Sequence, residues 1–208
     1  MPDSTPAHAA IGAPDDLLDA IATRWSPRSF ADRSVSPERI RLVLEAARWA
    51  PSSSNTQPWR YVVARREEKA AFADLLACLN AANQAWARHA PVLMLGYVAT
   101  VNPATGKPLA YALHDMGAAS ALLSVQAAAL GLQAHQMAGI VKEEAAARIK
   151  APEGFEFKTA LALGYPGPAD RLPDDLAARE TAPRVRRELS EFVFGTAWGE
   201  PAAIVEAE

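Results

Sequence analysis

The 208-residue chain is poor in three features that would place it in a special class of protein: cysteine, long hydrophobic runs and an excess of one charge. Its one cysteine, Cys78, cannot form an intrachain disulfide, so a reducing cytoplasm fits best. Its two most apolar runs, 91–98 and 118–132, are too short or too interrupted by polar residues to cross a hydrocarbon core. The 21 Lys plus Arg against 24 Asp plus Glu give a formal net charge of -3, which disfavours wholesale binding to nucleic acid. We therefore expect a cytoplasmic protein that spans no membrane.

Several widespread catalytic motifs are also missing. The chain contains no G-x-S-x-G nucleophile elbow, no phosphate loop ending in Gly-Lys-Ser/Thr and no G-x-G-x-x-G after a predicted strand. The four histidines are scattered without metal-ligand spacing, so we expect no metal. His114 and Asp115 could suggest a catalytic base and its orienting acid. Because neighbouring residues on a helix diverge by about 100°, we interpret them instead as the polar entry of a buried helix.

The composition and the hydrophobic patterns indicate one folded domain. Half of the residues are apolar and 22% are charged. Hydrophobic periodicity and capping residues predict helices over residues 15–23, 37–50, 67–87, 109–130 and 142–149. Apolar and β-branched runs predict strands over residues 59–64, 91–98, 132–136 and 158–164. The helix at 109–130 is apolar nearly all round and is expected to lie buried at the centre. Alternating strands and helices without a linker predict an α+β domain over 15–208, after a flexible tail at 1–14.

The last part of the chain, residues 165–208, is predicted to be an extended segment rich in proline and charge. Its hydrophobic spacing is too sparse to offset the entropy of ordering it alone. Residues 192–194 form one short, strand-like apolar run, and Trp198 follows them. We expect these residues to pack on another surface, and a partner subunit is a natural one.

The most distinctive charge pattern lies at residues 24–28. Pro27 pushes Ser26 into an extended conformation, and alternate residues of an extended segment point the same way. Arg24, Ser26 and Arg28 would then present two guanidinium groups and a hydroxyl on one side, which suits a phosphate dianion. A second basic group lies near the C-terminus and comprises Arg184, Arg186 and Arg187. Any one of these arginines could instead lie on a solvated surface or pair with an acid, such as Asp15, Asp16 or Asp32.

Taken in order along the chain, five segments resemble the FMN-dependent nitroreductases. Residues 24–30 resemble the R-x-S-x-R-x-F opening of that family, and residues 50–59 resemble its A-P-S-x-x-N-x-Q-P-W segment. The resemblance continues through three looser segments, at 131–139, 163–166 and 186–193. It extends from about residue 20 to residue 198. The first two motifs are specific in combination, and the others add support through their order and spacing.

This resemblance implies a nitroreductase-like fold, with a central, mostly antiparallel sheet flanked by helices. It implies a homodimer in which the C-terminal tail clasps the partner subunit and FMN is bound at the interface. The activity implied is hydride transfer from NADH or NADPH, followed by reduction of a nitroaromatic, a quinone or a similar small acceptor in a ping-pong mechanism. The alternative is a flavin-binding or flavin-handling protein without nicotinamide-dependent turnover.

The resemblance also implies the residues that bind FMN, and it assigns the chemistry to the flavin rather than to a catalytic side chain. Arg24, Ser26 and Arg28 would hold the phosphate and ribityl chain, with Trp25 between them, and Arg186 would close the phosphate site. Four residues would meet the flavin from the other subunit, namely Pro51, Ser52, Ser53 and Asn55. The backbone of four more would lie along the flavin ring, namely Gln136, Met137, Ala138 and Gly139. Two departures from the family pattern are Glu188, where proline is common, and the competition of Arg184 and Arg187 with Arg186 for the phosphate.

Overall fold

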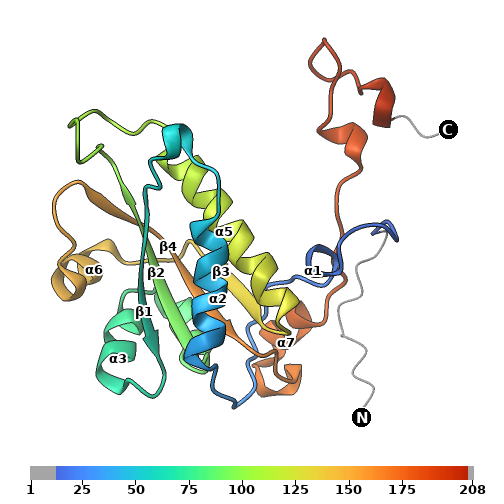
Figure 1. Ribbon diagram of the computed structural model, residues 1–208. Helices are drawn as coiled ribbons and strands as arrows, with labels where there is room; N and C mark the ends of the chain where they lie inside the picture. The colour runs from blue at the N-terminus through green and yellow to red at the C-terminus, as the bar shows by residue number, and fades with distance from the viewer. Residues whose placement is uncertain (1–12, 206–208) are drawn as a thin grey trace.

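The structure is a computed structural model that describes residues 13–205 (Figure 1). Its four strands form one sheet in the order β1-β2-β4-β3, and each neighbouring pair is antiparallel. The strands are β1 (Trp59–Arg65), β2 (Val92–Ala99), β3 (Gln133–Met137) and β4 (Phe155–Gly164). Each overlaps a predicted strand, so the expected α+β class with an antiparallel sheet is confirmed. The first twelve residues of the predicted N-terminal tail lie outside the described range.

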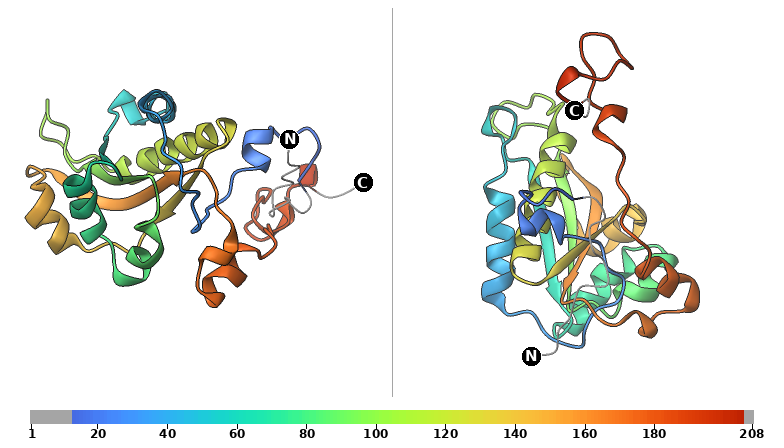
Figure 2. Two further views of the ribbon diagram at one scale, coloured as in Figure 1. Left: turned by 90° about the horizontal axis from the view of Figure 1, so that it is seen from below. Right: turned by 90° about the vertical axis from the view of Figure 1, so that its right-hand side faces the viewer.

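Helices cover both faces of this sheet (Figure 2). The longer ones are α2 (Pro37–Arg48), α3 (Lys69–Ala77), α4 (Ala81–Ala87), α5 (Ala112–Ala129), α6 (Lys142–Ile149) and α7 (Asp174–Glu180). Helices α2 and α5 share one hydrophobic core with the sheet, whereas α3, α4 and α6 share the other. Strand β2 contributes to both, because Met94 and Val98 belong to the first core and Leu93 and Leu95 to the second. All eight residues of β2 are buried, as its continuous apolar run predicts.

Helices α2 and α6 form where the sequence places them. At the start of α2, the Ser36 side chain accepts the Arg39 N–H at 3.4 Å, and Pro37 occupies the first turn. The helix ends at Arg48, shortly before Pro51. Helix α6 has the bounds predicted for it, residues 142–149. Local capping and hydrophobic spacing therefore suffice for these two elements.

The prediction of one helix over 67–87 is wrong, because the chain forms two helices separated by a turn at residues 78–80. Asn80 caps α4 through its side chain, which accepts the Asn83 N–H at 3.0 Å. The Asn80 N–H donates to the Gly139 carbonyl at 3.0 Å, and the Cys78 carbonyl accepts the Val141 N–H at 2.8 Å. These bonds tie the turn to a segment about sixty residues later, which hydrophobic spacing within 67–87 cannot reveal.

The helix predicted over 109–130, which we expected to lie buried at the centre, packs against the sheet but has an exposed side within this chain. Helix α5 begins at Ala112 and buries one face, which includes Met116, Ala119 and Leu123. Its exposed side has Leu113, 58% exposed, at one edge and Leu122, 39% exposed, at the other, because nine residues turn a helix by about 180°. Helix α5 therefore has apolar side chains that are not buried by the rest of its own chain.

The two ends of the described chain hold less regular structure than the sheet region. The predicted helix over 15–23 is reduced to α1 (Asp19–Ala22), which has no capping side chain and no buried residue. Beyond β4 lie α7 and three short 3-10 helices, η2 (Ala169–Arg171), η3 (Leu189–Glu191) and η4 (Ala203–Val205). The strand-like run at 192–194 forms no strand, and Phe194 makes a single bridge to Pro201. Figure 1 shows the end of this segment extending away from the sheet and its helices.

One glycine sets how closely α5 approaches the sheet. A Cβ atom at Gly96 in β2 would lie 2.2 Å from Met116 Cε in α5 and 2.9 Å from Thr159 Cγ2 in β4. The β2–β4 register also shifts between Gly96 and Tyr97. The first core therefore has no room for a side chain at this point. Within residues 13–205, no helix combines the length and the apolar character needed to cross a membrane.

Replacing Gly96 with alanine should lower the free energy of unfolding by about 1–3 kcal/mol, the usual cost of overpacking a core. Urea denaturation measures the change. Gly195→Ala is the matched control, because the nearest atoms to its new Cβ lie at 4.0 Å. Equal stability of Gly96→Ala and the wild type would show that α5 can move away from the sheet at little cost.

Candidate cofactor site

Residues 24–29 run outside the sheet between the end of α1 and the bridge at Phe30, and polar side chains from elsewhere bind the backbone groups of this extended segment and of Thr23 before it. Gln133 in β3 binds this segment twice. Its Nε2 donates to the Thr23 carbonyl at 3.1 Å, and its Oε1 accepts the Trp25 N–H at 2.9 Å. Gln133 is buried and is the first residue of β3, where it pairs with Gly164 of β4. Its two bonds therefore fix the start of the segment to the sheet.

His135, two residues further along β3, binds the middle of the same segment. Its Nδ1 lies 2.9 Å from the Pro27 carbonyl, which can only accept, so Nδ1 carries the proton. The ring packs against Trp86 of α4 with centroids 4.5 Å apart. Burial, with a smaller effect from the Arg28 charge, lowers the pKa of His135 to about 4. The imidazole is therefore neutral near pH 7 and acts as a fixed hydrogen-bond donor.

Glu180, the last residue of α7, binds the end of the segment. Its carboxylate accepts the Arg28 N–H at 2.9 Å from both oxygens, and its Oε1 also accepts the Ser29 N–H at 2.8 Å. The residue is only 1% exposed. The Ser29 hydroxyl donates to the Pro168 carbonyl at 2.6 Å, which adds a further bond to the segment that leads to α7.

Three arginines gather beside the first part of this segment. A cavity of about 250 Å³ is bordered by Arg24, Ser26, Arg184 and Arg186 among others. Burial and then the charges of Arg186 and Arg184 hold the pKa of Arg24 below its ordinary value. Within residues 13–205, the Arg24 guanidinium has no hydrogen-bond or ion-pair partner. A half-buried arginine that lies beside like charges and has no ion-pair partner is the electrostatic mark of an anion site.

The C-terminal arginines divide their roles. Arg184 donates to the carbonyls of Ala22 and Arg24, at 2.7 and 2.8 Å, and so serves the backbone. Arg187 is exposed and lies 3.8 Å from Glu191. Arg186 makes one bond, to the carbonyl of the preceding residue, and its charge acts on Arg24. Of the three, Arg186 is the one whose guanidinium remains available to an anion beside Arg24.

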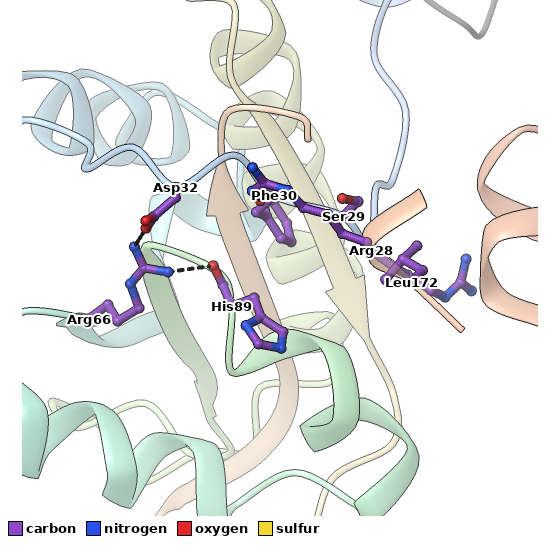
Figure 3. Close-up of a pocket in the computed structure, with 8 residues that line it drawn as sticks. Arg28, Ser29, Phe30, Asp32, Arg66, His89 and Leu172 are labelled. Atoms are coloured by element: carbon purple, nitrogen blue, oxygen red, sulfur yellow. Dashed lines mark hydrogen bonds and ion pairs between the residues drawn. The ribbon is translucent and has the colours of Figure 1, made fainter. Parts of the chain in front are cut away.

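Arg28 borders a different cavity, of about 360 Å³, so the structure does not bring all three predicted phosphate residues to one cavity. Figure 3 shows this second cavity with Arg66, which follows β1, between Asp32 and His89. Arg66 forms an ion pair with Asp32 and donates to the His89 carbonyl at 3.1 Å. Three arginines border this cavity, namely Arg28, Arg66 and Arg171, and an aspartate that pairs with Arg66 lies among them. Its positive charge is therefore partly neutralised, whereas Arg24 has no ion-pair partner within residues 13–205.

The segment predicted to lie along a flavin ring starts in β3 and leaves the sheet after Met137. The Gln136 side chain donates to the Ser120 carbonyl at 3.1 Å and to Ser124 Oγ at 3.0 Å, so it faces α5. Gln136 and Ala138 are exposed, whereas Met137 is buried. The solvent side of this segment therefore includes Gln136 and Ala138 but not the Met137 side chain.

Asn83 of α4 and the backbone of Asn80 hold Gly139 in place. Asn83 Nδ2 donates to the Gly139 carbonyl at 3.1 Å, beside the bond that the same carbonyl accepts from the Asn80 N–H. A Cβ atom at Gly139 would lie 2.4 Å from Asn80 Nδ2 and 2.6 Å from Asn83 Nδ2. Only glycine fits between these amides, which keeps the backbone at this point in a fixed position.

The polar loop after α2 is exposed yet tightly bent. It includes η1 (Ser53–Asn55). Three non-glycine residues of the loop have positive φ angles, Ser54 at 50°, Asn55 at 53° and Gln57 at 46°. Ser52 Oγ accepts the Gln57 N–H at 3.0 Å. Backbone strain of this kind persists only where the surroundings hold it, and it is enriched at binding sites.

Asp115 of α5 is one of the groups that hold this loop. It is 4% exposed, and its Oδ2 accepts the Ser53 N–H at 3.1 Å. Its Oδ1 lies 3.4 Å from His114 Nδ1, so the expectation that these two neighbours do not meet is wrong, although the contact is long. The His114 side chain is 82% exposed. Asp115 thus has a structural role in the loop, and His114 is a surface residue.

The predicted site residues therefore fall into separate groups within one chain. Arg24, Trp25, Ser26 and Arg186 border one cavity, and Arg28 adjoins it through the same extended segment. The loop at 51–55 lies at the far end of α2 from this segment (Figure 1), and the twelve residues of α2 span about 18 Å. Within the described residues, no group of three or more His, Cys, Asp or Glu side chains is placed to hold a metal ion.

Three residues with functional positions were missed by sequence reasoning: Gln133, Glu180 and Asn83. Gln133 is buried and His135 partly buried, two residues apart on one face of β3, and polar residues at this spacing in a strand are a usable sign of buried hydrogen bonds. Glu180 gives no such sign, because it lies in a charged run, DDLAARE. Asn83 reads as an ordinary surface residue of a helix.

The chain matches the model of the Nitroreductase family over residues 21–165. It is 30% identical over 160 residues to a putative NADH dehydrogenase/NAD(P)H nitroreductase from Archaeoglobus fulgidus, which covers 73% of this chain and 86% of that protein. Among solved structures, an oxidoreductase containing FMN has a TM-score of 0.81 and 35% identity, covering 90% of this chain and 94% of that one. A putative nitroreductase from Desulfovibrio desulfuricans, solved in complex with FMN, has a TM-score of 0.68 and 28% identity, covering 89% and 99%.

The family match includes the segment at 24–28, the loop at 51–55 and the segment at 136–139, and it ends before Arg186. The arrangement of the sheet and its helices agrees with both FMN-containing structures over most of each chain. The sequence resemblance to this family is thereby confirmed. The chain belongs to the nitroreductase family.

Proposed function

We propose that the protein is an FMN-dependent oxidoreductase that takes hydride from NADH or NADPH and reduces a nitroaromatic, a quinone or a similar small acceptor. The observation that carries this proposal is the arginine cluster of Arg24, Arg184 and Arg186, in which the half-buried Arg24 has no ion-pair partner within residues 13–205. The FMN phosphate is a dianion that fits such a cluster. Family membership and the FMN-containing relatives support the same cofactor.

The residues of this chain would then bind and orient the cofactor. Arg24 and Arg186 hold the phosphate, with Ser26 as a hydrogen-bond donor at the border of the same cavity and Arg28 next along the segment. The backbone of residues 136–139, fixed by Asn83, lies along the ring. When bound, FMN supplies the hydride chemistry, because it can accept a hydride and pass electrons on. No side-chain acid, base or nucleophile is assigned to the reaction.

The exposed apolar surface supports a homodimer in which the tail clasps the partner subunit. Leu113 and Leu122 lie at the two edges of the exposed side of α5, and the tail exposes Phe192 by 57% and Trp198 by 94%. Exposed apolar side chains on a helix and on an unsupported tail are typical of an interface. The loop at 51–55 is far from Arg24 in its own chain, so a partner's loop would have to complete each flavin site. A cytoplasmic location is part of the proposal and fits a single, buried cysteine, Cys78.

If the proposal is right, the purified protein is yellow and its flavin absorbance bleaches when NADH or NADPH is added under argon. Because one cleft serves both substrates, initial rates with a quinone or nitroaromatic should give parallel double-reciprocal lines. Intersecting lines would contradict the ping-pong order. A yellow protein that neither nicotinamide reduces would favour a flavin-binding protein without turnover, and a colourless one would exclude both.

Arg186→Ala should weaken FMN binding about 10- to 100-fold, because one charge-assisted hydrogen bond to the phosphate contributes about 1.5–3 kcal/mol. Arg187→Ala is the matched control, since Arg187 is exposed and directed to Glu191, and it should bind FMN like the wild type. Flavin fluorescence titration measures both dissociation constants. Loss of FMN affinity in Arg187→Ala with none in Arg186→Ala would reverse the assignment.

Deleting residues 188–208 should weaken the dimer, because Phe192 and Trp198 would lose their apolar burial on the partner, at about 25 cal/mol per Å². Sedimentation velocity across a range of protein concentrations reports the dissociation of the dimer. A truncated protein that stays dimeric, retains flavin and melts at the same temperature would show that the tail is not a clasp.

A further inference from the structure

Glu180 is a buried carboxylate whose hydrogen bonds go to backbone amides. It is 1% exposed, and it accepts the N–H groups of Arg28 and Ser29 at 2.8–2.9 Å. Within residues 13–205 it forms no ion pair with a lysine, arginine or histidine side chain. Yet it borders the same cavity as Arg24 and Arg186. A buried charge is costly unless it is well satisfied, so its presence at this point requires a reason.

Its position links the two halves of the anion site. On one side, its oxygens fix the backbone at Arg28 and Ser29, two residues beyond Ser26. On the other side, it ends α7, six residues before Arg186. Figure 1 shows α7 beside the segment that follows α1. A shift of this carboxylate would therefore move both the extended segment and the start of the chain that carries Arg186.

The Arg184 contacts strengthen this link from the same stretch of chain. Arg184 donates to the Ala22 and Arg24 carbonyls, while Glu180 accepts from the amides at the other end of the segment. The extended segment is thus held at both ends by side chains that lie only four residues apart in the C-terminal part of the chain. A donor at one end and an acceptor at the other fix the direction of the segment as well as its place.

We propose that Glu180 is the positioning residue of the phosphate subsite: it holds the segment of Ser26 and Arg28 against the C-terminal chain so that Arg24 and Arg186 converge on one phosphate. This inference rests on the proposed FMN site. It predicts that a change at Glu180 lowers the affinity for ligands that have a phosphate and leaves the affinity for ligands without one nearly unchanged. A merely structural residue would affect the binding of phosphorylated and unphosphorylated flavin equally.

The test compares FMN with riboflavin, which has the same ring and ribityl chain without the phosphate. Full-length protein stripped of flavin is titrated with each ligand, and flavin fluorescence gives the dissociation constants. Glu180→Ala should weaken FMN binding by at least about tenfold and change riboflavin binding by less than about threefold. Glu180→Gln keeps an oxygen that can accept both amides, so it should retain most of the preference for FMN.

Asp175→Ala removes an exposed carboxylate from the same helix and should leave both affinities unchanged. If Glu180→Ala is not recovered folded, Glu180→Asp replaces it, because its shorter side chain cannot reach both amides and should lower the FMN preference likewise. Equal losses for FMN and riboflavin, or an unchanged ratio in every Glu180 variant, would overturn the inference. A wild-type protein that does not prefer FMN to riboflavin would instead contradict the proposed phosphate site itself.

Discussion

The structure depends on how the backbone of residues 24–29, and of the end of α1 just before them, forms its hydrogen bonds without a neighbouring strand. A buried amide or carbonyl without a partner is costly, and this segment finds its partners in side chains. Gln133 and His135 of β3 serve its first part, and Glu180 and Arg184 of the C-terminal chain serve its two ends. The sheet and the C-terminal chain are thereby joined through a segment that belongs to neither.

This arrangement explains why the basic side chains of the segment remain available. Because other side chains satisfy its backbone, Arg24 needs to make no structural bond, and it keeps an unpaired guanidinium beside Arg186 within the described residues. The neutral state of His135 helps in a similar way, because a protonated imidazole would place a second positive charge close to Arg28. The proposed anion site therefore follows from the way the backbone is held.

The same arrangement leaves the rest of the C-terminal chain without support. Up to Arg184 the chain is bonded to the segment, whereas beyond it Leu189, Phe192 and Trp198 are all more than half exposed. The exposed side of α5 has apolar side chains at its edges as well. One chain thus exposes apolar side chains in two places, which is the physical basis for proposing a dimer.

The sequence predicted those elements whose causes are local. Strand β2 follows from its continuous apolar run, and α2 follows from Ser36, Pro37 and its hydrophobic spacing. The break between α3 and α4 was missed although Asn80 is a local capping residue, and the bonds that hold this turn reach Gly139 and Val141, about sixty residues away. A similar distinction holds at the candidate site. Residue type and family resemblance pointed to Arg24, Ser26 and Arg186, which border one cavity, whereas Glu180 binds the Arg28 amide across 152 residues, and that amide has no sequence pattern. The α5 prediction missed the exposed side, because composition shows that a helix is apolar but not whether the same chain covers it.

The central claim is that the cavity beside Arg24 is the phosphate subsite of a bound FMN. A crystal structure of the protein with FMN tests it most directly. The account predicts the phosphate within hydrogen-bond distance of Arg24 and Arg186, with Arg184 still bonded to the Ala22 and Arg24 carbonyls. A phosphate in the other basic cavity, beside Arg66, would contradict it.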